Sequence, residues 1–391
     1  MPIDLTGRRG KVAAGQQTGG GYVGRLAQRA VAPAEALARI QADLANLAAT
    51  IAAELARPAL ARDAARVQAA MAGMDALRPR LLRAVRVLAA LLDGEDAAAP
   101  RPSDGSLVRR QHLRQMRRDG RFQLGRWDAI RTCVLEQIPG DPRPLVPRRL
   151  PRHHPLAAQL AVSDAAFLAM HAMANPNAQS AEAKAHGCYP DIRMPPSRFL
   201  ELAHAAYRLV LARRGAGPFR FLDVGCGGGV KVLLAAGFFD AADGLEYDPG
   251  YAAAARDLFA ATAATRCRAI RGDALAFRDY GDYDVVYFFQ PMSDRDNLRA
   301  MEDRIVPQVR PGTVLIAPYQ AFLLRSDELG CPLVARSVHI AGVAPGEAAA
   351  MLDEAERIGT AVVRGRGGDA RLGFWSPVVA ASRANGFDPL Q

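Results

Sequence analysis

The stretch that decides the fold reads Phe221-Leu-Asp-Val-Gly-Cys-Gly-Gly-Gly229. A short apolar run ends in a turn rich in glycine, and a helical pattern follows it. Because glycine has no Cβ, such a turn lets a ligand approach the backbone closely. The pattern therefore predicts a cofactor site at the end of a buried strand. Two kinds of cofactor, dinucleotides and S-adenosylmethionine, bind at turns of this type.

The spacing of the glycines separates these two cofactors. Dinucleotide binding requires GxGxxG or GxGxxA, and Val230 stands at the sixth position counted from Gly225. The alternative pattern is an acidic residue followed, two places later, by GxGxG. Asp223, Gly225, Gly227 and Gly229 match it at every position. The stretch resembles motif I of the class I S-adenosylmethionine-dependent methyltransferases.

The elements downstream extend this resemblance over roughly residues 190–320. Glu246 lies 23 residues past Asp223, where a second strand should end. The resemblance implies that Glu246 binds the ribose hydroxyls, that Asp273 accepts from the adenine amino group, and that Ala274 contacts the adenine ring. The complete set of implied cofactor-binding residues is Asp223, Gly225, Cys226, Gly227, Gly229, Glu246, Tyr247, Asp273, Ala274 and Phe289.

The end of the fourth expected strand reads Phe289-Gln-Pro-Met292. Nucleic-acid and glutamine amino-methyltransferases commonly carry Asp/Asn/Ser-Pro-Pro-aromatic there, so this departure disfavours methylation of a nucleobase amino group. The acidic ligands of metal-dependent catechol-type enzymes are also missing from it. The amide of Gln290 could orient a substrate but cannot act as a base. The catalytic residue is therefore unknown, with Gln290 and Tyr189 as candidates.

The segment His186–Ser197 precedes the first helix of this region. In the resembled family such a segment often folds over the cofactor as a lid, which makes Tyr189, Asp191 and Arg193 candidates to face the methyl donor or substrate. An ordinary structured loop is the alternative for each of them. His186 and Cys188 are too sparse a pair for a metal site, and no metal is expected.

From about residue 196 helical and strand-like runs alternate, which indicates a mainly parallel sheet with helices on both faces. The expected fold is α/β, a Rossmann-like seven-stranded methyltransferase sheet with a helical N-terminal extension. Helices are expected at 196–214, 229–237, 250–261, 294–309 and 346–358. Strands are expected at 219–224, 243–247, 267–272, 283–289, 313–318, 333–341 and 372–380.

The rest of the chain divides by composition. Residues 1–30 are Gly- and Arg-rich and are expected to form a disordered tail. Apolar residues three and four apart predict a helical hairpin or short coiled coil over 31–93, packed within the chain or on a second copy, with Pro58 and Pro79 ending or kinking its helices. Residues 94–155 are expected to form a linker and a basic Arg/Pro-rich region. The methyltransferase domain should span 156–391, with its core at 196–320.

The net charge of +10 gathers in the basic region, because residues 101–152 hold 13 Lys and Arg but 5 Asp and Glu. An acidic partner such as RNA would bind there. Arginine makes up all but three of the 50 basic residues, however, which is equally typical of a compositional bias. Neither a signal peptide nor a membrane span is expected, and the five scattered cysteines fit a cytoplasmic location.

These patterns predict an enzyme that transfers a methyl group from S-adenosylmethionine to an unidentified acceptor. A small molecule or a protein fits better than a nucleobase amino group. The alternatives are an RNA methyltransferase that uses the basic region, an NAD-dependent oxidoreductase, and a non-catalytic adaptor with a retained cofactor fold. The glycines Gly225, Gly227 and Gly229 with Glu246 and Asp273 argue against a decayed site.

Overall fold

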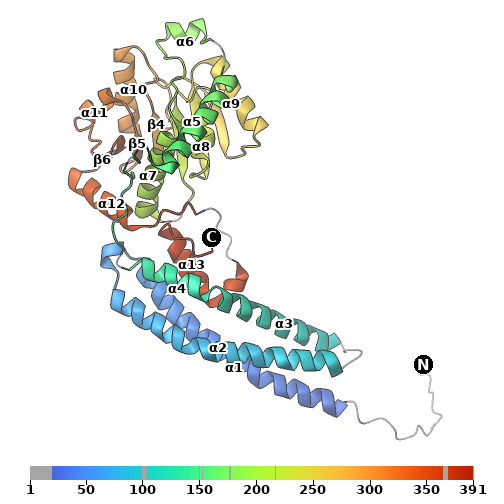
Figure 1. Cartoon of the computed structure of the whole chain (residues 1–391). Coiled ribbons are helices and arrows are strands. Elements are labelled where there is room, and N and C mark those ends of the chain that lie inside the picture. The colour runs from blue at the N-terminus through green and yellow to red at the C-terminus, as the bar shows by residue number, and fades with distance from the viewer. Residues whose placement is uncertain are drawn as a thin grey trace, which may run out of the picture. The chain divides into compact units, whose positions relative to one another are not determined.

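The computed structural model describes residues 20–98, 104–138, 140–148, 150–151, 153–175, 178–215, 217–363 and 369–390 (Figure 1). They form two compact units, each built from separate stretches of chain. The first holds the described residues of Met1–Ile51, Ala65–Asp128 and Gly367–Pro377. The second holds those of Ala52–Ala64, Ala129–Arg366 and Val378–Gln391.

The first unit is helical. Its long elements are α1 (Gly20–Leu55), α2 (Ala64–Ala98) and α3 (Asp104–Gly125), and α3 packs against the 3₁₀ helix η3 (Ala370–Trp375). Most of the apolar positions predicted from the three-and-four spacing are buried, among them Leu37, Leu44, Val67, Met74, Leu81 and Leu88, whereas Leu60 is exposed. Trp127, at the start of α4 (Trp127–Glu136), packs edge-on against Trp375 and donates from Nε1 to Asp75 at 2.8 Å.

Several expectations for this region are wrong. α1 begins at Gly20, so residues 20–30 of the expected tail are helical, and residues 1–19 lie outside the described residues. α2 continues through Pro79 to Ala98. A proline inside a helix removes one backbone hydrogen bond, and buried side chains on both sides of Pro79 outweigh that loss. Most of the basic run lies in α3, with Arg side chains exposed around the buried Leu113.

The domain boundary also differs from the expected one at residue 156. In the second unit, Asn385 donates from Nδ2 to the carbonyl of Leu55 at 2.8 Å, and the amide of Ala59 donates to Glu354 at 2.9 Å. The unit therefore includes chain from before and after the basic region. Contacts between residues about 300 positions apart leave no periodic signal in the sequence.

The second unit confirms the expected α/β fold with a seven-stranded sheet, in the order β3-β2-β1-β4-β5-β7-β6. β7 is antiparallel to both of its neighbours, and the other pairings are parallel. The expected strand 333–341 is split into two by Arg336, whose φ is +45°. The strands are β1 (Arg220–Val224), β2 (Ala241–Glu246), β3 (Cys267–Arg271), β4 (Val285–Phe288), β5 (Val314–Ile316), β6 (Leu333–Ala335) and β7 (Val338–Ile340).

The expected strand at 372–380 is wrong, because this stretch forms η3 and α13 (Ser376–Ala384). Pro377 occupies the first turn of α13, where its missing N–H costs no hydrogen bond. Gly373, with φ of +52°, turns the chain just before it. The apolar run there packs as helix, and its length alone could not distinguish the two.

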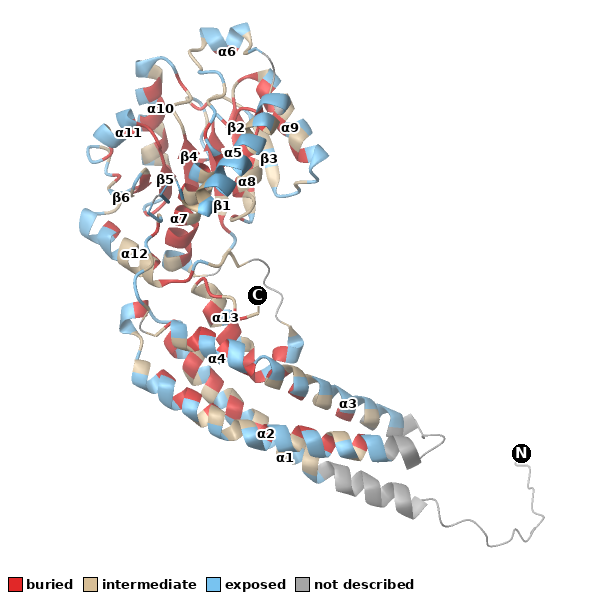
Figure 2. Ribbon diagram, in the orientation of Figure 1, coloured by how far each residue is buried: buried red, intermediate tan, exposed pale blue. Residues whose placement is uncertain are grey.

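Successive residues of the strands face opposite sides of the sheet, and buried strands run through its middle (Figure 2). On one side Phe221 and Tyr287 meet α7 (Pro196–Arg214), α8 (Val230–Ala235), α9 (Pro249–Ala261) and α12 (Pro345–Arg357). On the other Leu222 and Phe288 meet α10 (Arg295–Gln308) and α11 (Gln320–Arg325). Burial on both faces leaves the strand ends to carry polar function.

Two further helices precede α7. They are α5 (Pro155–Ala174) and the short α6 (Ala181–Ala185). Among the described helices, one stretch, Pro155–Met173 of α5, has the length and apolar composition of a membrane span, with 6% of it buried. Asp164 interrupts this run and accepts hydrogen bonds from the amide and hydroxyl of Ser197 at 2.8 and 2.7 Å.

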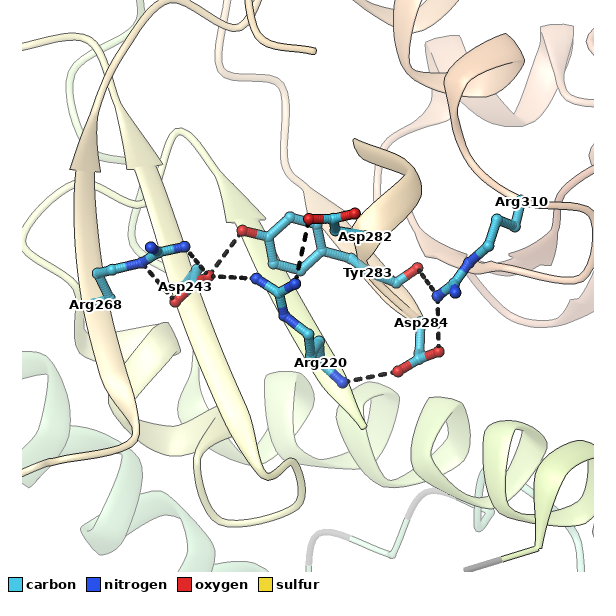
Figure 3. Close-up of polar contacts among 7 residues, drawn as sticks. All are labelled: Arg220, Asp243, Arg268, Asp282, Tyr283, Asp284 and Arg310. Atoms are coloured by element: carbon cyan, nitrogen blue, oxygen red, sulfur yellow. Dashed lines mark hydrogen bonds and ion pairs between the residues drawn. The ribbon is translucent and has the colours of Figure 1, made fainter. Parts of the chain in front are cut away.

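A polar network ties the strands together away from the Gly-rich turn (Figure 3). The buried carboxylate of Asp243 accepts from the hydroxyl of Tyr283 at 2.8 Å and from the guanidinium of Arg268 at 2.7 Å, with Arg220 at 3.4 Å. A second carboxylate, on Asp284, accepts from the backbone amide of Arg220 at 2.8 Å. These bonds cross β1, β2 and β3 and the start of β4, so they hold the sheet in register.

We expect Asp243→Asn to lower the free energy of unfolding by about 1–3 kcal/mol, because a buried network loses its negative charge and one of its two acceptor oxygens. Asp282 provides the matched control, since its carboxylate is mostly exposed and meets only the edge of the network at Arg220. Asp282→Asn should cost under about 1 kcal/mol. Urea unfolding of both variants measures the difference, and equal losses would contradict a structural role for Asp243.

Candidate functional site

The Gly-rich turn follows β1 in a conformation that requires glycine. The φ angles of Gly225, Gly227 and Gly229 are +77°, +55° and +80°. A Cβ on Gly225 would lie 2.6 Å from Cβ of Pro291, and one on Gly229 would lie 2.8 Å from the ring of Phe259. The sequence folds this way because these three positions have both the left-handed backbone and no room for a side chain.

Glu246, the last residue of β2, fastens the turn to the second strand. Its Oε2 accepts from the amide of Gly227 at 2.8 Å, and its Oε1 accepts from the amide of Asp248 at 2.8 Å. Burial raises the pKa of this carboxyl to about 7. Each carboxylate oxygen has a second lone pair, so Glu246 can hold the turn and still accept from two ligand hydroxyls.

The residues expected to bind an adenine lie together beside β2 and β3. The ring of Tyr247 stacks on the imidazole of His186, with centroids 4.2 Å apart and planes 9° apart. Nε2 of His186 lies 3.3 Å from Oδ1 of Asp273, which also accepts from the amide of Leu275 at 2.8 Å. The structure thus brings Tyr247 and Asp273 to one place, and His186 covers them.

The segment 186–193 lies along the loop that follows β4. The amide of Tyr189 donates to the carbonyl of Pro291 at 2.9 Å, and the amide of Ser293 donates to the carbonyl of Gly187 at 2.7 Å. Gln290 has a φ of +47°, which is rare for a residue with a side chain and is typical of a functional turn. Tyr189 and Gln290, the two catalytic candidates, therefore come from chain segments that are hydrogen-bonded to each other.

A cavity of about 40 Å³ lies between this segment and the turn. It has room for a few water molecules and not for a nucleoside. Nine of the predicted site residues line it: Tyr189, Asp191, Gly225, Gly227, Glu246, Tyr247, Ala274, Phe289 and Gln290. Asp223, Cys226, Gly229 and Asp273 lie outside its lining, and Arg193 is exposed.

Asp223 lies behind the turn, fully buried, and neither of its carboxylate oxygens has a hydrogen-bond partner among the described residues. Burial raises the pKa of this carboxyl to about 8, and the ammonium of Lys231 acts against that rise. Lys231 was not a candidate from motif spacing. Only the composition of the chain could have pointed to it: the sequence has three lysines against 47 arginines, and Lys231 is one of the three.

Asp191, a lid candidate, is the residue that joins Lys231 to the turn. Its carboxylate lies 3.5 Å from Nζ of Lys231 and 3.5 Å from Nε2 of His171. It also accepts from Nδ2 of Asn175 at 2.7 Å and from the amide of Gly228 at 3.2 Å. Sequence reasoning missed His171 and Asn175, which end the apolar helix α5 and match no motif.

Solved structures resemble part of this chain. CalS10, an amino pentose methyltransferase from Micromonospora echinaspora solved with S-adenosylmethionine, is 27% identical over 37% of this chain and 58% of its own, with a TM-score of 0.27. An RNA methyltransferase from Salinibacter ruber, in complex with S-adenosylhomocysteine, is 23% identical over 33% of this chain and 76% of its own, with a TM-score of 0.26.

The glycopeptide N-methyltransferase MtfA, complexed with S-adenosylmethionine, is 20% identical over 29% of this chain and 53% of its own, with a TM-score of 0.25. These three matched proteins are methyltransferases. They cover a minor part of this chain and differ in acceptor, so its reaction rests on its own residues. The sequence matches no protein-family model and no curated protein.

We expect Gly227→Arg and Asp273→Ala each to abolish binding of S-adenosylhomocysteine without unfolding the chain. A Cβ on Gly227 would lie 2.1 Å from the carboxylate of Asp191, so a side chain there fills the site. Gly346→Ala is the matched control, since a Cβ there meets nothing within 4 Å. Calorimetry that shows unchanged affinity in both site variants would refute the site.

We expect the unliganded protein to lose stability as the pH rises through about 7 and 8. The folded-state pKa values of Glu246 and Asp223 are about 7 and about 8, against about 4 in an unfolded chain. Their contribution is therefore complete below about pH 4 and is lost as each carboxyl ionises. Urea unfolding at about pH 6 and about pH 9 measures this loss. Asp223→Asn, which cannot ionise, should reduce it, and an undiminished loss would contradict this origin.

Proposed function

We propose that this chain is a methyltransferase that uses S-adenosylmethionine and acts on a small molecule or a protein. The observation that carries the proposal is the glycine turn Gly225–Gly229 fastened to Glu246, with Tyr247 and Asp273 converging beside it. The Gly-rich turn lets a ligand lie close to the backbone, and Glu246 can accept from the two ribose hydroxyls. Asp273, beside the ring of Tyr247, can accept from the adenine amino group. Together these residues fit an adenosyl group.

The charge of the site fits a cationic cofactor. Glu246, Asp273 and Asp191 surround the turn, and Lys231 is the single ammonium within it. S-adenosylmethionine supplies a methyl carbon made electrophilic by its sulfonium. The protein then has to orient an acceptor in line with the bond that breaks, and correct orientation supplies much of the rate.

The acceptor side is formed by the loop after β4. Phe289, Gln290 and Met292 line the cavity together with Tyr189. The Gln290 amide can hold an acceptor atom in place, and the Phe289 side chain excludes water.

The basic stretch 101–152 is proposed only as a possible binding surface for an acidic partner. Part of its charge is already compensated within the helical unit. Arg117 pairs with Asp93 of α2 at 3.1 Å. RNA binding would be strongly salt-dependent, and a salt-insensitive interaction would exclude it. Association of two copies through the N-terminal helices likewise stays a proposal.

A labelled-methyl transfer assay on fractionated cell extract tests the function. We expect label from S-adenosylmethionine in the protein or small-molecule fraction, and none with Asp273→Ala. Gln290→Ala should lower turnover about tenfold or more while the affinity for S-adenosylhomocysteine stays the same, because it removes orientation of the acceptor only. Tight NADH binding without S-adenosylhomocysteine binding would overturn the proposal.

A further inference from the structure

The carboxylate of Asp191 is surrounded by hydrogen-bond donors at the Gly-rich turn. Its Oδ2 accepts from Asn175 Nδ2 at 2.7 Å and from the Gly228 amide at 3.2 Å, and lies 3.5 Å from His171 Nε2. Its Oδ1 lies 3.5 Å from Nζ of Lys231. The Asp191 side chain is 3% exposed. A backbone amide, a carboxamide, an imidazole and an ammonium thus surround one buried carboxylate.

This carboxylate fills the space that the glycines leave open. A Cβ on Gly227 would lie 2.1 Å from Asp191 Oδ2, and a Cβ on Gly228 would lie 1.7 Å from Asn175 Oδ1. The absence of side chains on the turn opens a cradle for a ligand. In this structure Asp191 and Asn175 press into that cradle, and the cavity that remains is too small for a nucleoside.

Two aspartates act on the ammonium of Lys231. Burial opposes its charge, but Asp191 and Asp223 outweigh burial and raise its pKa. Asp223 is buried on the same side of the turn, and both of its oxygens lack a partner among the described residues. Of these two aspartates, Asp191 is the one that lies 3.5 Å from Nζ of Lys231 and belongs to the segment over the site.

A free acceptor lies beside these donors. Oδ1 of Asn175 is buried and has no hydrogen-bond partner among the described residues, while its Nδ2 is bonded to Asp191. Unpaired buried acceptors are costly, and they are typical of sites that a ligand completes. Donors for a carboxylate next to an unused acceptor for an ammonium are the pattern that recognises an α-amino acid.

We propose that Asp191 is an internal stand-in for the α-carboxylate of S-adenosylmethionine, and that the cofactor displaces it. This inference rests on the proposed function. The α-carboxylate of the cofactor takes over the Gly228 amide, Nδ2 of Asn175 and the Lys231 ammonium, and Asn175 Oδ1 accepts from the α-ammonium. Only the α-carboxylate has to displace Asp191. The movement of His186 away from Tyr247 and Asp273 is a separate step that admits the adenosyl group, so every adenosyl ligand needs it.

The contribution of the amino-acid group of the cofactor to binding can be measured by comparing two nucleoside ligands. S-adenosylhomocysteine has it, and 5′-methylthioadenosine lacks it. In calorimetry on the full chain, we expect Asp191→Ala to tighten binding of S-adenosylhomocysteine about tenfold, because an internal competitor reduces the binding-competent fraction. Binding of 5′-methylthioadenosine should stay within about twofold. Glu201→Gln, which removes a carboxylate paired with Arg336 elsewhere in the same unit, is the matched control.

A second variant tests the donors. Lys231→Met is made in the Asp191→Ala background, because removal of Lys231 alone would leave the buried carboxylate of Asp191 without its ion-pair partner. It should weaken binding of S-adenosylhomocysteine about tenfold or more relative to Asp191→Ala and leave 5′-methylthioadenosine unaffected. Thermal unfolding of each variant checks that the fold is intact, and a variant that does not fold is replaced by Asp191→Asn or Lys231→Gln.

The outcomes separate the two proposals. Weaker binding of S-adenosylhomocysteine to Asp191→Ala would overturn the inference, because Asp191 would then hold the cofactor rather than compete with it. Equal changes for both ligands, or no change, would also overturn it. If the native chain binds neither ligand, the proposed function fails and the inference fails with it. If both ligands bind normally and only the Asp191 effect is missing, the proposed function stands.

Discussion

The carboxylate of Glu246 joins two backbone amides, those of Gly227 and Asp248, and the geometry of the site follows from this join. One bond holds the Gly-rich turn, and the other holds the start of α9. The amides of Gly225 and Cys226 add bonds to the carbonyl of Leu245. The turn is therefore fixed to the neighbouring strand before any ligand binds. A buried carboxylate can do this because the amides offset much of its cost of burial.

The two ends of the sheet use charge differently. Away from the turn, Asp243 is met by Arg268 and by the hydroxyl of Tyr283, so its charge is compensated within the fold. At the turn, Glu246 and Asp223 are buried with weaker compensation, and burial raises both pKa values. The first arrangement stabilises the sheet. In the second arrangement, the ionised form of each buried carboxyl is unfavourable, and a cationic ligand would stabilise it. Carboxyls with perturbed pKa values cluster at functional sites for this reason.

The segment 186–191 gives the site a second layer. Its backbone is bonded to the loop after β4, while His186 and Asp191 cover the two ends of the cradle. The donors that a ligand would meet are paired internally in its absence, whereas Oδ1 of Asn175 has no partner among the described residues. The apparent affinity of such a site for its ligand includes the free energy needed to move the segment.

Much of the fold could be predicted because its signals are local. The first five strands and their helices alternate in apolar runs, and the three glycines at 225, 227 and 229 are needed where the backbone turns left-handed. Predictions failed where local signals were ambiguous. The apolar stretch at 372–380 is compatible with either a strand or a helix, and it forms helix. Pro79 was expected to end or kink a helix, but α2 continues through it because the side chains around it are buried.

The sequence by itself determined the first five strands of the sheet, the position of the turn, and the positions of Glu246 and Asp273 at strand ends, because motif spacing along one chain specifies where strands end. Only the tertiary structure decided that Asp191, Asn175 and Lys231 meet on the turn. These residues lie 16 and 40 positions apart on a loop, a helix end and a helix start. No periodicity links them, and burial of their charges, which gives the cluster its chemistry, exists only once the chain has folded.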